Sequence, residues 1–396
     1  MRSDWREVPL SEVAELTVGY VGTMSSEYKK NGIKFLRSLN IRPFKIDFSD
    51  IKYISDEFHR KLSKSELREG DVVIVRTGQP GASAVIPANC GPMNCSDLVI
   101  IHPDKEEIDP LFLAAYINWS SGIINASLVG AVQQHFNVGA AKKMVLALPD
   151  IRIQKKISAI IGCINDKIEL NNRINDNLQQ QAVAIYKAWF SDCSVETGST
   201  PWPNTTIEEI TSLVVRGITP KYNDDTDQIV INQKCIRNHM IDLAPARRHL
   251  PKAITEKWLM QGDLLINSTG EGTLGRVAQV WFVPNNLTVD SHVTIVRPKS
   301  SSLRNYIGFW GLTHEKEIEA LHTGSTGQTE LPRERVKAME LPLPDESTLS
   351  RFNELITPMT QAIIKNQHEN LRLGELRDAL LPRLMSGELD VSELNL

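Results

Sequence analysis

The sequence predicts a mixed α/β (α+β) fold in which two globular domains of similar fold are joined by two long helices that form an antiparallel coiled coil. Three observations lead to this prediction. Blocks of sequence recur at an interval near 195 residues, each copy starts with about 150 residues rich in short apolar runs, and each copy ends in a stretch with helical spacing. A chain of 396 residues is also long enough for two or three domains.

Four blocks of the first half return in the same order in the second half. Residues 69–78 (EGDVVIVRTG) return as 261–270 (QGDLLINSTG), and residues 96–103 return as 291–298. The other two blocks are Trp5 with Leu10 and Val13, which return as Trp202, Ile207 and Ile210, and residues 148–150, which return as 343–345. The intervals of 192 to 197 residues are what small loop insertions would produce. We therefore predict an internal tandem duplication with pseudo-two-fold symmetry.

The first part of each copy has the pattern of a β-rich domain. Short apolar runs bounded by Gly, Pro and Asn predict strands. The runs lie at 72–75, 98–101, 264–266, 277–283 and 293–296. These parts give one domain over residues 1–150 and a second over residues 196–345.

A helical pattern takes over after each of these domains. Residues 153–190 contain no proline, and their apolar residues follow one another at steps of mostly three and four, which is typical of a long coiled-coil helix. The second copy repeats the pattern from Phe352 to Leu384, where Pro358 is expected to kink or restart the helix. We place the helices within 151–195 and 346–396. Because neither can bury its apolar stripe alone, we expect them to pair and to hold the domains at opposite ends of a rod.

Asparagines interrupt both apolar stripes at matching places. They are Asn171 and Asn175 in the first helix, and Asn366 and Asn370 in the second. A buried asparagine in an apolar seam costs stability but fixes register and pairing. We predict this role for the four residues; the alternative is that they face solvent.

The composition excludes several classes of protein. The formal net charge of −4 excludes a uniformly basic DNA binder but leaves room for local basic patches. The longest strongly apolar runs, about five residues, are far shorter than the roughly 20 residues that span a bilayer, so we expect no membrane segment. The five cysteines include no CxxC pair and are predicted to be reduced thiols of a cytoplasmic protein.

Catalytic and metal-binding signatures are missing as well. The sequence contains no phosphate-binding GxxxxGKS/T loop, no HExxH and no GxSxG, and its histidines show no ligand spacing. We therefore assign no catalytic residue and no metal ligand. Residues 270–275 fit the dinucleotide motif GxGxxG, but a strand pattern follows over 276–283 where that fold needs a helix. We predict a glycine-rich hairpin there.

Basic residues gather at equivalent places in the two copies. Residues 28–46 contain six basic residues and no acidic one, and residues 234–252 contain five basic residues and one acidic one. A solvated charged face would explain either cluster alone, but their recurrence favours contact with DNA phosphates. Glutamines recur near the end of each domain, and Gln can bond adenine, as Arg can bond guanine, through two hydrogen bonds. A loop glutamine that is merely solvated is the alternative.

These patterns give two sets of candidate DNA-binding residues. In the first copy they are Lys29, Lys30, Lys34, Arg37, Arg42, Arg76, Gln79, Gln133, Gln134 and His135. In the second copy they are Lys234, Arg237, Asn238, Arg247, Arg248, Arg276 and Gln328. Two modules with similar backbones and different surface residues should read different bases, so the expected target is bipartite and asymmetric, with unread base pairs between its halves.

The helical segments resemble a known family, the specificity (S) subunits of type I restriction–modification systems. Residues 376–389 (LRDALLPRLMSGEL) are similar to the family's C-terminal signature, residues 184–190 (AIYKAWF) to the end of its central conserved region, and residues 148–154 (LPDIRIQ) to the entry of that region. Two positions depart from the family pattern: Ile153 replaces a usual Glu, and Leu349 replaces the Gln in the second copy. Both lie at a helix start, so they leave the resemblance intact.

The resemblance implies a function for every part of the chain. The two variable domains would be target recognition domains that read double-stranded DNA, and the helices would dock two methyltransferase (M) subunits. Those M subunits would bring S-adenosylmethionine and adenine methylation, restriction (R) subunits would add ATP- and Mg-dependent chemistry, and this chain would bind no cofactor itself. The alternative is a coiled-coil scaffold that binds only proteins, which the net negative charge mildly favours.

Overall fold

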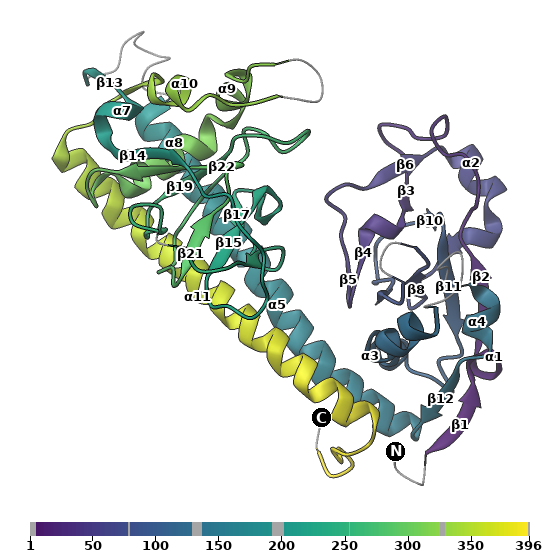
Figure 1. Ribbon diagram of the computed structural model, residues 1–396. Helices are drawn as coiled ribbons and strands as arrows, with labels where there is room; N and C mark the ends of the chain where they lie inside the picture. Colours follow the sequence, from purple (N-terminus) through teal and green to yellow (C-terminus); the bar gives the residue numbers. More distant parts are fainter. Residues whose placement is uncertain are drawn as a thin grey trace. The chain divides into compact units, whose positions relative to one another are not determined.

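In the computed structural model the chain forms two units, each with one β-rich domain and half of each long helix (Figure 1). The structure describes residues 5–77, 80–128, 137–191, 202–252, 254–324 and 329–394. Unit 1 is Met1–Leu170 with Glu369–Leu396, and unit 2 is Asn171–His368. The sequence-based boundaries separate helices from domains, whereas the contacts join each half-helix to the domain beside it, because its apolar face packs into that domain's core.

The first domain is built on a four-stranded antiparallel sheet. Its order is β2 (Ala14–Val18), β11 (Leu98–Pro103), β8 (Val72–Val75) and β9 (Ser83–Val85). On β8, Val72 and Ile74 enter one apolar cluster while Val73 and Val75 enter another. Successive side chains of a strand point to opposite faces, so four apolar residues in a row suit a strand that lies between two cores.

A second sheet and several short elements complete the first domain. The sheet order is β6 (Lys52–Ile54), β3 (Ile33–Leu36), β10 (Met93–Cys95) and β7 (Glu66–Leu67), with β3 and β10 parallel. Two pairs stand apart: β4 (Ile41–Arg42) with β5 (Lys45–Ile46), and β1 (Arg6–Pro9) with β12 (Val145–Leu148). The helices are α1 (Leu10–Val13), α2 (Asp56–Lys61), α3 (Pro110–Leu128) and α4 (Val138–Lys142), with 3₁₀ turns η1 (Ser38–Asn40) and η2 (Ser63–Ser65).

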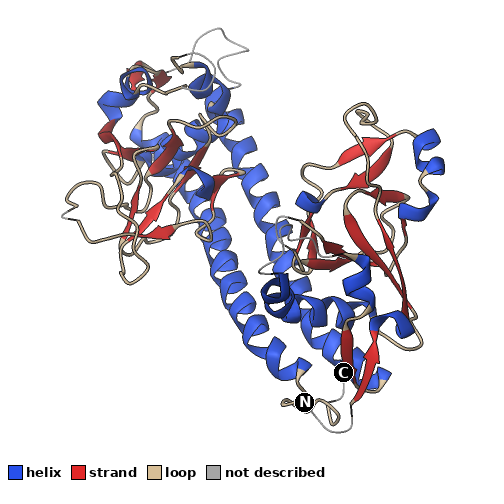
Figure 2. Ribbon diagram, turned by 45° about the vertical axis from the view of Figure 1, so that its right-hand side comes forward, coloured by secondary structure: helices blue, strands red, loops and turns tan. Residues whose placement is uncertain are grey.

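The second domain repeats the strand order of the main sheet, which confirms the duplication. Figure 2 shows the strands of both domains in red. Its main sheet has the order β14 (Thr211–Arg216), β22 (Val293–Pro298), β19 (Leu264–Asn267), β20 (Val277–Gln279). The other strands are β18 (Arg247–Arg248), β15 (Ile229–Ile231) and β21 (Leu287–Val289) in one sheet, β16 (Ile236–Arg237) with β17 (Met240–Ile241), and β13 (Asn204–Thr206) with β23 (Glu340–Pro342). The helices are α7 (Ile207–Ile210), α8 (Leu303–Thr313), α9 (Glu315–Ala320) and α10 (Arg333–Lys337), with the 3₁₀ turn η4 (Gln233–Cys235).

The GxGxxG segment lies between two antiparallel strands of this second domain. Leu264 of β19 pairs with Gln279 of β20, and the chain between them turns without starting a helix. A dinucleotide fold would place a helix N-terminus there. The prediction of a glycine-rich hairpin is therefore confirmed.

Two long helices end the two copies. They are α5 (Ile151–Tyr186), followed by a π-helical turn over Lys187–Ser191, and α11 (Glu346–Met385). The expected restart at Pro358 is wrong, because α11 is helical without interruption there. Phe352, Ile356 and Ile363 are buried in the domain core on both sides of the proline, and this packing compensates for the missing backbone hydrogen bond.

The two helices are antiparallel in each unit. In unit 1, Lys167 forms an ion pair with Glu369 at 3.4 Å, and Arg377 donates to Asn165 at 3.2 Å. In unit 2, Asn366 donates to Asn175, and the ring of Phe352 contacts Tyr186. Partner numbers fall along α11 as they rise along α5 in both units, as the sequence predicts.

Candidate nucleic-acid interface

Five predicted cations are exposed and form no side-chain hydrogen bond or ion pair within the described residues. They are Lys29, Lys30, Arg42, Lys234 and Arg237. Arg42 and Arg237 occupy the same place in the two domains, at the end of the first strand of the β4–β5 and β16–β17 hairpins. A cation that no acidic side chain of the protein neutralises is free to neutralise a DNA phosphate.

The other two basic candidates of the first cluster, Lys34 and Arg37, form contacts within the fold. Lys34 donates to the Cys90 carbonyl at 2.8 Å and lies over the ring of Phe48. Arg37 bonds the carboxylate of Asp50 at 2.8 Å and holds the pKa of that carboxyl below its usual value. Both side chains are half-buried and bonded within the protein, which limits the donors they can offer to a phosphate; their predicted contact with DNA stays a prediction.

Three arginines of the second domain are also bonded within the protein. Arg247 stacks on the Tyr222 ring, with 3.5 Å from its guanidinium carbon to the ring centroid. Arg248 donates to the Thr226 carbonyl and lies 3.6 Å from Asp227, and Arg276 donates to the Gly272 carbonyl at 2.7 Å. These contacts limit the free donors that each guanidinium can offer to DNA.

Asn238 lies at the exposed tip of the β16–β17 hairpin. Asn238 and His239 have φ of 51° and 60°, as a two-residue turn between antiparallel strands requires. His239 lies 3.3 Å from Glu315. Although burial raises the pKa of Glu315, hydrogen bonds from His239 and the Val277 amide hold that pKa below its usual value. Asn is favoured at this backbone position, so its presence is explained by the turn itself.

A polar cluster that the sequence did not fully reveal lies at one end of the first domain's main sheet. Arg76, just after β8, donates to Asp97 at 2.8 Å, and the Thr77 hydroxyl donates to the same carboxylate at 3.1 Å. Asp97 forms the two-residue turn between β10 and β11 with φ of 51°. Arg76 keeps 18% of its side chain exposed and Asp97 42%, so the pair is held in place and still reaches the surface.

The second domain has a matching cluster with different chemistry. Thr269 follows β19 as Thr77 follows β8, and its hydroxyl bonds Nδ1 of His292 at 2.7 Å. His292 precedes β22 as Asp97 precedes β11. Gln233 of η4 lies beside Thr269, 3.5 Å from its hydroxyl. Part of this signal is visible in the sequence: Thr77 and Thr269 recur in the blocks 69–78/261–270, and Asp97 and His292 occupy a position at which the blocks 96–103/291–298 differ. Gln233 lies outside these blocks.

A glycine stands where the chain that leaves β2 or β14 passes close to each of these turns. A Cβ on Gly217 would lie 2.0 Å from the Val289 carbonyl oxygen, and one on Gly19 would lie 2.8 Å from Sγ of Cys95. Gly19 and Gly217 donate to Leu98 and Val293 at the start of β11 and β22. The backbone around the two clusters is therefore built the same way.

Five candidates from the sequence lie outside the described residues. They are Gln79, Gln133, Gln134, His135 and Gln328. Their proposed contacts with DNA stay predictions.

The helix asparagines can be placed more fully. Asn171 and Asn175 are buried, at 1% and 5% exposure, and Asn366 donates to Oδ1 of Asn175 at 2.8 Å. Asn370 is half-buried. These positions fit the expectation that the asparagines face the helix pair; their role in fixing register stays a prediction.

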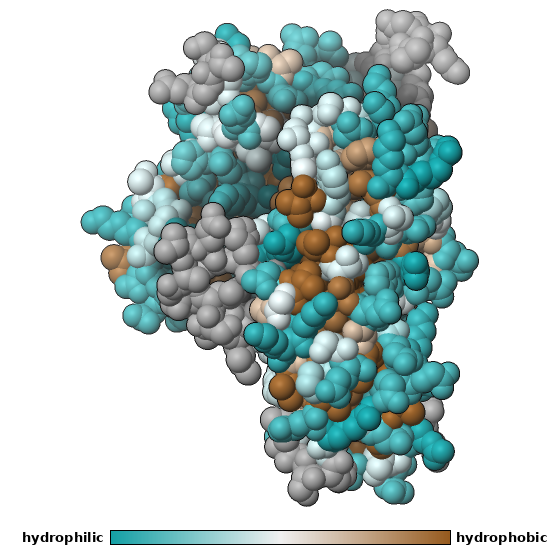
Figure 3. Space-filling view, turned by 90° about the vertical axis from the view of Figure 1, so that its right-hand side faces the viewer, coloured by the Kyte–Doolittle hydropathy of each residue, from teal (hydrophilic) through white to brown (hydrophobic). Residues whose placement is uncertain are grey.

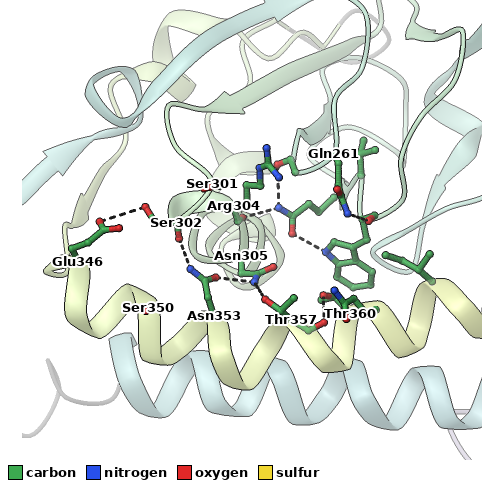
Figure 4. Close-up of a pocket in the computed structure, with 16 residues that line it drawn as sticks. Gln261, Ser301, Ser302, Arg304, Asn305, Glu346, Ser350, Asn353, Thr357 and Thr360 are labelled. Atoms are coloured by element: carbon green, nitrogen blue, oxygen red, sulfur yellow. Dashed lines mark hydrogen bonds between the residues drawn. The ribbon is translucent and has the colours of Figure 1, made fainter.

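A polar pocket of 410 Å³ lies between α8 and α11 in unit 2 (Figure 4). Asn305 donates to Asn353 and to Thr357, and Asn353 donates to the Ser302 carbonyl (Figure 4). The amides and hydroxyls of this wall bond one another, so they join the domain to its helix. The residues that line the pocket include neither the cluster of Gln233, Thr269 and His292 nor the exposed cations Lys234 and Arg237.

Apolar residues remain on the surface of the helices. On the face of the molecule shown in Figure 3, hydrophobic side chains are exposed among hydrophilic ones. Among the helix residues of unit 1, Leu170 is 52% exposed, Leu371 61% and Leu376 48%. No helix of the described chain is long and apolar enough to cross a membrane, and no group of three or more His, Cys, Asp or Glu in it is placed to hold a metal ion.

Comparison with known proteins relates the chain to a family. Residues 2–180 match the family model described as "Type I restriction modification DNA specificity domain". The chain is 24% identical to the type I restriction enzyme MjaIX specificity subunit of Methanocaldococcus jannaschii, over 64% of this chain and 62% of that protein. It is 22% identical to the HindI specificity subunit of Haemophilus influenzae, over 98% and 100% of the two chains. By these comparisons the first domain and the start of the first long helix match the family model, and the chain as a whole is similar to type I restriction–modification specificity subunits.

A solved specificity subunit has the same fold. The crystal structure of the type I S subunit from M. genitalium matches 96% of each chain with a TM-score of 0.55 and 13% sequence identity. The resemblance stated from the sequence is thereby confirmed. The comparisons do not favour the scaffold alternative.

Proposed function

We propose that each domain of this specificity subunit reads one half of a bipartite, asymmetric DNA site. The single observation that carries the proposal is the pairing of equal backbones with unequal side chains. The two main sheets have the same strand order, so the domains should dock on DNA alike. The side chains at the equivalent turn, Asp97 and His292, differ, so the base pairs that the domains prefer should differ too.

Phosphate contacts would supply most of the affinity. Lys29, Lys30 and Arg42 in the first domain, and Lys234 and Arg237 in the second, are exposed and unpaired among the described residues. Lysine and arginine side chains that meet phosphates release condensed counterions, and this release favours binding without regard to sequence. The acidic residues that give the chain its net charge of −4 would then lie outside these phosphate contacts.

The exposed leucines of the helices support a second part of the proposal, the docking of two M subunits. Apolar residues that a protein leaves exposed in a band mark surfaces for protein partners. The M subunits would bring S-adenosylmethionine and adenine methylation, and R subunits would add ATP- and Mg-dependent restriction. A chain with these partners and chromosomal DNA as its target would work in the cytoplasm.

The decisive experiment is a methylation map of DNA from cells that express the chain with its M subunit. A bipartite asymmetric adenine-methylated motif with an unread gap is the expected result. A short continuous motif would mean that the two domains do not read independently. An intact complex that methylates no DNA would overturn the proposed DNA recognition and favour the alternative of a protein-binding scaffold.

The phosphate contacts are tested separately by the salt dependence of DNA binding. We expect Arg42→Ala and Arg237→Ala each to weaken binding to all sequences alike and to lower the slope of log K against log salt by about one. Lys61→Ala is the matched control, because Lys61 is an exposed lysine paired with Glu57 at 2.7 Å. If all three variants keep the slope of the unmodified chain, the two arginines lie outside the DNA interface.

A further inference from the structure

We propose that Arg76 and Asp97 in the first domain, and Gln233 and His292 in the second, contact bases and determine which base pairs the chain selects. Thr77 and Thr269 are the positioning residues that hold them. This inference rests on the proposed function and names the residues that carry its specificity. It follows from a comparison of the two copies, residue by residue, at the turn that enters β11 and β22.

The same framework residue supports a different side chain in each domain. Thr77 and Thr269 are equivalent, since both follow the central strand of the main sheet. Each hydroxyl bonds the side chain that precedes the neighbouring strand of the sheet. In the first domain this is Asp97, before β11, at 3.1 Å; in the second it is His292, before β22, at 2.7 Å. If the only role of this residue were to stabilise the turn, the same side chain would serve in both domains. A threonine shared by the two copies, beside a surface-reaching side chain that differs between them, suits a position that reads a different base in each domain.

The first cluster is held in place and still reaches the surface. Asp97 stands in a turn with φ of 51°, a conformation that Asp and Asn tolerate better than other side chains. Arg76 and Asp97 keep 18% and 42% of their side chains exposed, so a partner that approaches this end of the sheet can meet both.

The chemistry of the first cluster suits a G·C pair. A guanidinium can donate two hydrogen bonds to O6 and N7 of guanine, and a carboxylate can accept from N4 of cytosine. Asp97 bonds one terminal nitrogen of Arg76, which fixes the guanidinium plane and reduces the entropy lost on binding. The first domain is therefore expected to require a G·C pair at one position of its half-site.

The second cluster contains a glutamine amide in place of a charged pair and suits an A·T pair. The Thr269 hydroxyl links Nδ1 of His292 to Oε1 of Gln233, so the three side chains hold one another. A glutamine amide can accept from N6 and donate to N7 of adenine. Gly270 fixes the distance between the loop and this amide, because a Cβ there would lie 2.5 Å from Oε1 of Gln233.

The test is selection from duplex DNA libraries with both half-sites randomised, using the full chain in complex with its M subunits. Arg76→Lys keeps the charge and loses the two-bond geometry. We expect it to reduce discrimination at one or two adjacent positions of one half-site by roughly 10- to 100-fold, and to leave the other half-site unchanged. Gln233→Ala should do the same to the other half-site, at an A·T pair. Arg6→Lys is the control, since Arg6 pairs with Glu107 on the surface of the first domain.

The outcomes separate this inference from the proposed function. If the unmodified complex selects no bipartite motif, the proposed function fails. If it does, and Arg76→Lys and Gln233→Ala leave every position unchanged or weaken all positions equally, only the base-reading assignment is overturned. His292→Ala, a change at an exposed residue, provides a second variant if Arg76→Lys does not assemble. A wild-type motif without a G·C pair in the half-site that Arg76→Lys alters would also overturn it.

Discussion

An aspartate precedes β8 in the first domain and β19 in the second, and its side-chain partner differs between the two domains. Asp71 and Asp263 are equivalent, both buried, and each accepts from a backbone amide three residues earlier, Arg68 at 2.6 Å and Met260 at 2.8 Å. In the first domain the other partner is Nδ1 of His102 at 2.7 Å. In the second it is Arg297, which bonds both carboxylate oxygens at 2.8 Å.

This difference shows which part of the duplicated framework is constrained. The aspartate closes a turn that both domains share, so its carboxylate must be satisfied in both. The partner only has to supply a donor from β11 or β22, and either a ring nitrogen or a guanidinium can do so. The backbone geometry is thus retained between the copies while the side chains around it have diverged, as they have at the turn clusters.

The largest expected effect comes from breaking the second pair. Arg297→Ala would leave the 1% exposed Asp263 as a buried carboxylate without its cation, and should lower the free energy of unfolding by about 3–5 kcal/mol. His102→Ala removes one hydrogen bond from Asp71 and should cost about 1–3 kcal/mol. Denaturant titration of both variants measures the difference.

A surface ion pair serves as the control for that comparison. Arg383→Ala removes the exposed pair with Glu388 and should change the free energy of unfolding by less than about 1 kcal/mol. Equal losses for His102→Ala and Arg297→Ala would show that the guanidinium adds nothing to the buried site.

The asparagine pair extends the comparison to the helices. Asn366→Leu would leave Oδ1 of the buried Asn175 without its donor and should cost about 1–3 kcal/mol. The double variant Asn175→Leu/Asn366→Leu should recover that loss, because two apolar groups suit the seam, but it should form complexes with mixed helix register. Thermal unfolding and the size of the complexes with M subunits report the two effects. A double variant as unstable as the single one would contradict this account.

The smallest effect concerns a buried histidine of the second domain. His249 and Ile54 are equivalent and both fully buried, and neither ring nitrogen of His249 has a hydrogen-bond partner among the described residues. Burial lowers the pKa of His249 below 6.5, so the unfolded state binds a proton more readily than the folded one. Its contribution to stability is present above pH 6.5 and is lost as the pH falls toward the lowered pKa.

His249→Ile tests this difference between the domains. It should raise the thermal stability of the second domain slightly at neutral pH and more at acidic pH, because it removes the proton uptake on unfolding. Melting temperatures between pH 8 and pH 5 check it, with Ile54→Val as the control for a change of volume at the same position. A pH dependence equal to that of the unmodified chain would refute the role of His249.

The sequence by itself determined the duplication, the long helices and the glycine-rich hairpin. Each depends on a regular local signal. Apolar residues every three or four positions specify a helix, continuous apolar runs specify strands between two cores, and recurring blocks reveal a repeat whatever its fold. The family resemblance came from the same source, since residues 376–389 lie in one continuous segment.

The tertiary structure decided which charged residues are free. Lys34 and Arg37 resemble Lys29 and Arg42 in the sequence, but their partners Cys90 and Asp50 lie 56 and 13 residues away along the chain. Pro358 stays helical because residues of the domain core hold α11 on both sides of it. Such contacts join distant parts of the chain, so local patterns carry no record of them. Position in space, rather than residue type, separates a cation that is bonded within the fold from one that is exposed without such a bond among the described residues.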